Sequence, residues 1–157
     1  MSALRAVALF FAAALLQWWW STHFSFWGLS PQILLALTAV IASRRGPDRG
    51  MGYGFAWGLF LDVLRPELFG GNAFCLMLVG YASGTVRRQI DVDDFVSQGV
   101  VVALMTWGYF LCYGLLGVIF SQGFLWPGWP AFLFDPFYNC LLAPLAGLTC
   151  SRLGGRP

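Results

Sequence analysis

The sequence predicts an all-α integral membrane protein whose six transmembrane helices form one compact bundle. Three observations predict this fold class. The 157 residues are 59% hydrophobic and only 10% charged, with a mean hydropathy of +0.70, a composition too apolar for the surface of a soluble domain. The apolar residues form six runs that can each cross a bilayer, although the second and third are short against the ~20 residues of a full crossing. All nine basic residues are arginines, and they gather between these runs.

The positions of the arginines also predict the orientation of the chain. If each apolar run crosses the bilayer once, eight arginines fall on the side that holds both chain ends, and only Arg65 falls on the other. Because arginine accumulates in short cytoplasmic loops, both termini are expected in the cytoplasm, with the protein in the inner membrane. The net charge of +2 does not indicate nucleic-acid binding, since the arginines form no basic stripe.

The first three predicted spans cover about residues 4–20, 29–43 and 50–64. The first run continues into Trp18, Trp19 and Trp20, with no small-x-small cleavage site after it, so it is expected to be an uncleaved span rather than a signal peptide. The second run begins near Pro31, and proline suits the first turn of a helix.

The last three predicted spans cover about residues 72–87, 95–120 and 131–151. The third and fourth runs share a short outer turn, which predicts an antiparallel hairpin. No CxxC motif or neighbouring histidine accompanies the cysteines, so neither a disulfide framework nor a metal site is expected. The four cysteines lie inside the apolar runs at Cys75, Cys112, Cys140 and Cys150.

Small residues recur at helical spacing on the third and fourth spans. Gly50, Gly54 and Gly58 lie at i, i+4 and i+8, while Gly80 and Gly84 share a face of the fourth span. Small residues allow close approach of helices inside lipid. These glycines therefore indicate a helix-packing face, with a groove for a partner helix as the alternative.

Asp62 is the next member of the first glycine series. A carboxylate within a membrane helix costs roughly 2.5–3.5 kcal/mol on insertion scales, so it is expected to have a partner. The partner could be Arg65, three residues further along the same helix. Alternatively, a buried polar cluster could join Asp62 to Asn72, Asp135 or Asn139 across helices, although Asp135 could instead begin the sixth helix, where a carboxylate is favourable.

The third and fourth spans resemble the MreD family of rod shape-determining proteins. The resemblance lies in the run Gly-Phe-Ala-Trp-Gly-Leu-Phe-Leu-Asp at 54–62, the turn containing Gly70 and Gly71, and Gly-Tyr-Ala-Ser-Gly at 80–84. The dipeptide of Pro31 and Gln32 also fits the family. Length, six spans and inside termini match over essentially the whole chain, whereas the specific motif covers only about residues 50–84.

The resemblance implies a noncatalytic scaffold of the bacterial cell-elongation (rod) complex, multi-pass in the inner (cytoplasmic) membrane. The implied partners are a bitopic MreC-like protein, the MreB filament, and a RodA-type glycosyltransferase with its transpeptidase, besides membrane lipid. Docking of the MreC-like span on the glycine stripes would support peptidoglycan synthesis and rod shape. No cofactor, catalytic residue or metal ligand is implied, and the fold is expected to resemble the substrate-binding subunits of energy-coupling-factor transporters.

Two other functions stay open at this stage. A vitamin-binding subunit of an energy-coupling-factor transporter would use an outer pocket near Asp62, Asn72, Asp135 and Trp126, and a small-x-x-x-small contact at Ala8 and Ala12. An aspartyl protease would use Asp62 and Asp135 as a pair of carboxylates that share a proton and activate water. The sequence lacks the Asn-rich motifs of lipoprotein signal peptidases and also GxSxG and HExxH, so an enzyme is not expected.

Overall fold

The computed structural model describes residues 3–23, 32–64, 68–86, 94–121, 123–126 and 128–153. Within these ranges the chain forms six helices and no strand. Each helix coincides with one of the six apolar runs to within a few residues, so the predicted all-α fold class is confirmed. The helices are α1 (Ala3–His23), α2 (Ile33–Arg45), α3 (Pro47–Leu64), α4 (Gly71–Val86), α5 (Phe95–Ser121) and α6 (Trp129–Leu153).

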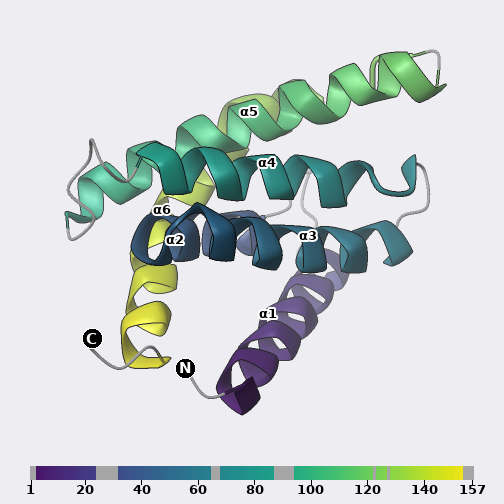
Figure 1. Cartoon of the computed structure of the whole chain (residues 1–157). Coiled ribbons are helices and arrows are strands. Elements are labelled where there is room, and N and C mark those ends of the chain that lie inside the picture. The colour runs from purple at the N-terminus through teal and green to yellow at the C-terminus, as the bar shows by residue number, and fades with distance from the viewer. Residues whose placement is uncertain are drawn as a thin grey trace.

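The shortest of these helices, α2, lies at the centre of the bundle. It packs against all five other helices, and its residues Leu34 to Ala42 are buried without interruption. A helix that is apolar on every side is expected to be covered on every side. In Figure 1, α3 and α4 run side by side as an antiparallel hairpin, α5 passes along the far side of α4, and α1 leaves the bundle at an angle.

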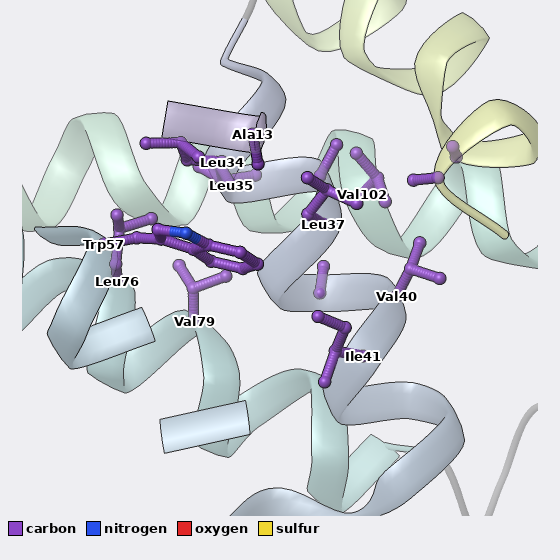
Figure 2. Close-up of a cluster of buried hydrophobic side chains, with 14 residues drawn as sticks. Ala13, Leu34, Leu35, Leu37, Val40, Ile41, Trp57, Leu76, Val79 and Val102 are labelled. Carbon is purple, nitrogen blue, oxygen red and sulfur yellow. The ribbon is translucent and has the colours of Figure 1, made fainter. Parts of the chain in front are cut away.

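A cluster of buried apolar side chains holds these helices together around Trp57 of α3. The indole is fully buried, and in Figure 2 it lies among Leu76 and Val79 of α4 and Leu34 and Leu35 of α2. The ring of Phe10 stacks on it from α1, with ring centroids 6.0 Å apart. A buried aromatic ring of this size contributes a large share of core stability.

Glycines bring α3 and α4 into backbone contact. A Cβ atom added at Gly54 would lie 2.7 Å from the carbonyl carbon of Leu76, and one at Gly50 would lie 2.8 Å from the carbonyl oxygen of Gly80. A Cβ atom at Gly58 would lie 2.5 Å from the backbone nitrogen of Ala73. The stripes on the two helices therefore face each other within one chain, which is the close packing that small residues permit.

Within the described residues, one helical segment, Val96–Phe120, is long and apolar enough to span a membrane by itself. Phe10–Trp19 and Gly71–Val86 form shorter apolar helices. The first turn of α3 carries Asp48 beside Arg49, which shortens its apolar part. The crossing of the membrane by each of the six helices, and the cytoplasmic position of both termini, therefore stay predictions.

Candidate functional site

The carboxylate of Asp62 caps the N-terminus of α4. One of its oxygens, Oδ1, accepts hydrogen bonds from the backbone nitrogen of Asn72 at 3.0 Å and from its side-chain Nδ2 at 2.9 Å. The other oxygen accepts from the backbone nitrogen of Ala73 at 3.0 Å. The first backbone N–H groups of a helix have no acceptor within that helix. The carboxylate of Asp62, on the preceding helix, is the acceptor for two of these N–H groups of α4. The Asp62 side chain is itself fully buried.

Two features bring Asp62 to this position. Gly58, one turn earlier on α3, leaves room for the backbone of α4. Gly70 precedes α4 with a φ of +91°, a conformation that favours glycine, and its carbonyl oxygen accepts the first hydrogen bond of the helix, from Phe74 at 3.0 Å. The chain therefore turns sharply enough for the end of α3 to reach the start of α4.

The polar contact continues from α4 to α5. The hydroxyl of Tyr109 donates a hydrogen bond to Oδ1 of Asn72, whose Nδ2 donates to Asp62. The three side chains thus link α3, α4 and α5. Every described polar atom in this chain of contacts has a partner, which is the condition under which a buried polar network stabilises a fold.

The N-terminus of α2 is capped in a different way. The backbone nitrogen of Gln32 donates to Oδ1 of Asn139 at 3.0 Å, and that of Ile33 donates to Oε1 of Gln17 at 2.8 Å. These amide side chains come from α6 and α1. The amide nitrogen of Asn139 also donates to Oγ1 of Thr106 on α5 at 3.1 Å, so the start of α2 is joined to three other helices.

Asp135 lies in the second turn of α6, one turn before Asn139, rather than at the start of the helix. It is only 3% exposed, and its Oδ1 has no hydrogen-bond partner in the described structure. The residues predicted to form one polar cluster are thus divided between two helix N-termini, with Asp62 and Asn72 at one and Asn139 at the other. Arg65 lies outside the described residues.

Reasoning from the sequence missed Gln17, Thr106 and Tyr109 at these sites. The available signal was the presence of polar side chains inside apolar runs, since Gln17 and Thr106 are both buried. Gln32 was noted only as part of the family pattern that follows Pro31.

Both oxygens of Asp62 are held by donors of α4, an arrangement suited to fixing a helix rather than to activating water. No group of three histidine, cysteine, aspartate or glutamate side chains within the described ranges could hold a metal ion. The chemistry of the site is hydrogen bonding between helices.

The family model of the rod shape-determining protein MreD matches residues 2–150 of the 157 residues. The chain belongs to the MreD family. MreD proteins are a membrane protein family with a role in determining rod shape, and this family is a structural one rather than a known enzyme family. No curated protein and no solved structure matches the chain. The expected resemblance to energy-coupling-factor subunits therefore stays a prediction.

The residues that carry the resemblance to the MreD family include those that build the α4 cap. Two of the three parts of the predicted motif, the run from Gly54 to Asp62 and the Gly70 turn, build the α4 cap. They supply Gly58, which leaves room for α4, the capping carboxylate of Asp62 and the turn itself. The first two parts of the motif thus meet at the start of α4, whereas Gly80 and Gly84 of its third part pack against the first turn of α3 near Gly50 and Pro47.

Proposed function

We propose that this protein is a noncatalytic membrane scaffold of the cell-elongation complex. In this role it docks a bitopic MreC-like protein and, together with the MreB filament and a RodA-type glycosyltransferase with its transpeptidase, supports peptidoglycan synthesis. The match of the MreD family model to nearly the whole chain carries the proposal. The use of Asp62, Asn72 and Asn139 in contacts between helices supports a rigid, noncatalytic part.

The packing of the bundle favours one surface for docking of the partner's membrane span. The glycines of the two stripes on α3 and α4 face each other, so they leave no room for a second chain between them; these are Gly50, Gly54, Gly58, Gly80 and Gly84. Gly108 differs, because it is exposed and a Cβ atom there would meet nothing within 4 Å. It stands thirteen residues from each end of α5, at the middle of the longest apolar helix.

The face around Gly108 has the composition of a helix-docking surface in lipid. Its larger neighbours are apolar and about half exposed, and the glycine between them lets a partner backbone approach closely. We assign the docking face of the MreC-like span to this stripe. It consists of Val100, Leu104, Gly108, Leu111 and Leu115.

Affinity purification of the tagged protein from mild detergent tests the proposal and the docking face separately. The wild-type protein is expected to bring down an MreC-like protein, and its absence from the wild-type sample would contradict the scaffold function. Gly108→Leu fills the stripe and is expected to lower recovery of this partner about tenfold, the effect of ~1.4 kcal/mol of lost affinity.

Gly52→Leu is the matched control for this experiment. Gly52 of α3 is also exposed, with nothing within 4 Å of an added Cβ atom, so both variants place the same side chain at an open helix surface. Equal recovery of the partner with both variants would exclude the α5 stripe as the docking face while leaving the scaffold function intact.

A further inference from the structure

The guanidinium group of Arg44 lies where three helices meet. Arg44 is in the last turn of α2, at the opposite end of this helix from the cap at Gln32. A Cβ atom added at Gly147 of α6 would lie 3.5 Å from Nη2 of Arg44 and 3.0 Å from Oε1 of Gln98, in the first turn of α5. Side chains of α2 and α5 therefore converge beside the backbone of α6, and the missing side chain of Gly147 leaves room for them.

The charge of Arg44 is only partly compensated by its described surroundings. The side chain is half-buried, and its Nε is the one nitrogen of the group that is buried without an acceptor in the described structure, which leaves the terminal Nη1 and Nη2 as donors for a ligand. The two acids described at this end are exposed, since Asp94 caps α5 through Ser97 and Asp48 is in the first turn of α3. The dipole at the end of α2 favours a cation but does not neutralise it.

The surroundings of Arg44 favour an anion as the ligand. Arg45 and Arg49 follow within five residues, so the electrostatic potential at this end of the bundle is positive. On the predicted topology this end is on the cytoplasmic side, and basic pockets between membrane helices on that side bind the head groups of anionic lipids. A guanidinium group donates two parallel hydrogen bonds to a phosphate group.

We propose that Arg44 anchors a binding site for a phosphate group at the junction of α2, α5 and α6. The terminal N–H groups of Arg44 donate to the phosphate oxygens, and the negative charge of the ligand compensates the guanidinium. This activity goes beyond scaffolding. The same chemistry is found in the head groups of anionic phospholipids and in free phosphate, and two probes distinguish these sources.

The test measures binding of radiolabelled phosphatidylglycerol and of radiolabelled inorganic phosphate to the tagged full-length protein in a non-ionic detergent. Phosphatidylcholine is the control lipid, because its choline group cancels the phosphate charge. Saturable binding of phosphatidylglycerol about tenfold tighter than that of phosphatidylcholine supports the site and identifies a lipid ligand. Saturable binding of inorganic phosphate supports the site and identifies a soluble ligand. If neither result is obtained with the wild-type protein, the site is refuted.

Two variants of Arg44 connect binding to the junction. Arg44→Gln removes the charge and is expected to weaken binding of the probe about tenfold, the effect of losing a hydrogen bond between charged groups. Arg44→Lys keeps the charge but not the pair of parallel donors. Its affinity is expected to lie between those of the wild type and Arg44→Gln.

Arg49→Gln is the matched control. It removes the same charge from an exposed position in the first turn of α3, so it changes the net charge of the protein as Arg44→Gln does. Its affinity for the probe is expected to stay within about twofold of the wild type, because exposed charges are screened by salt. Equal losses in Arg44→Gln and Arg49→Gln would show attraction by the basic surface alone. If an acid of the chain itself neutralised Arg44, Arg44→Gln would bind as the wild type does, and either result refutes the site.

Discussion

The N-termini of α4 and α2 present the same physical problem and solve it differently. Both leave backbone N–H groups without intrahelical partners in a largely apolar bundle. At α4 the acceptor is the carboxylate of Asp62, ten residues from Asn72 in the sequence. At α2 the acceptors are two neutral amides, Gln17 and Asn139, and the latter lies 107 residues from Gln32.

The difference follows from how closely the helices approach. Where Gly58 puts α3 in backbone contact with α4, a short aspartate on the same helix reaches two N–H groups of its neighbour. At α2 no single side chain serves both N–H groups, so two helices each contribute one acceptor. The α4 cap is therefore local and concentrated in one residue, whereas the α2 cap is distributed. The two arrangements are expected to respond differently to mutation.

The largest effect is expected from Asp62→Leu. This change removes the acceptor for three hydrogen bonds and leaves buried donors on Asn72 and Ala73. Unpaired buried donors cost about 1–3 kcal/mol each, so the free energy of unfolding should fall by at least about 3 kcal/mol. Unfolding by SDS in mixed micelles measures this loss. Asp62→Asn keeps one acceptor oxygen and should lose less, and an unchanged midpoint for Asp62→Leu would contradict the capping role.

Gly58→Ala tests whether the α4 cap depends on backbone contact. The added methyl group would lie 2.5 Å from the carbonyl oxygen of Asn72, so the helices must separate and the Asp62 bonds lengthen. Overpacking of this kind costs about 1–3 kcal/mol. Gly52→Ala, on the open face of α3, is the control and should gain up to about 1 kcal/mol from helix propensity. Equal stability of the two variants in the same assay would refute the packing explanation.

The α2 cap depends on two side chains, so each single substitution there should lower the free energy of unfolding less than Asp62→Leu does. Asn139→Leu removes the acceptor of Gln32 and the bond to Thr106, and should cost about 2 kcal/mol. Gln17→Leu removes the acceptor of Ile33 and should cost about 1 kcal/mol. A loss from either variant as large as that of Asp62→Leu would show that the two caps do not differ.

The smallest effect concerns a cap on the protein surface. Asp94 precedes α5 and accepts from the hydroxyl of Ser97 at 2.8 Å and from its backbone nitrogen at 3.1 Å, and these bonds lower the pKa of the carboxyl below its ordinary 3.8. Since the folded pKa is depressed, the contribution to stability is present above pH 3.8 and disappears as the pH falls through the folded value.

Asp94→Ala should therefore be slightly less stable than the wild type at pH 7 and equal to it at a pH below the folded pKa. Thermal unfolding over this pH range measures the difference between the two proteins. A difference that persists at the lowest pH would mean that the carboxylate charge is not its source.

The sequence predicts features that depend on local pattern. Apolar runs predict the six helices. The spacing of Gly54, Gly58 and Asp62 predicts that the carboxylate lies on the same helix-packing face as the glycines, at its end. The predicted contact of Asp62 with Asn72 needs only a short turn between neighbouring helices, and the structure contains it.

Contacts between distant parts of the chain could not be predicted in the same way. Nothing in the periodicity of α6 shows that Asn139 lies at the start of α2, because that contact depends on how α6 crosses the central helix. Likewise, Tyr109 is one of several aromatic residues on an apolar helix, and only its position opposite Asn72 distinguishes it. The short outer turn predicted the antiparallel hairpin of α3 and α4, and the structure contains it. The choice between packing of the glycines within the chain and a groove for a partner helix could not be made from the sequence, because both use the same spacing of small residues.

The residues of the α4 cap and of the α2 cap are synthesised at different times, so the two caps can form at different stages of translation. The ribosome completes the α3–α4 hairpin, with Asp62 and its donors on Asn72 and Ala73, while the last helix is still unmade, so the α4 cap can form before α6 exists. The backbone N–H of Gln32 has its acceptor on Asn139, which is synthesised much later. Before that, only the N–H of Ile33 has its acceptor, on Gln17. The first turn of the central helix can therefore be fixed at both N–H groups only after Asn139 has been synthesised. Nascent chains arrested after residue 126 should accordingly show a protected α3–α4 pair and an exchangeable amide at Gln32.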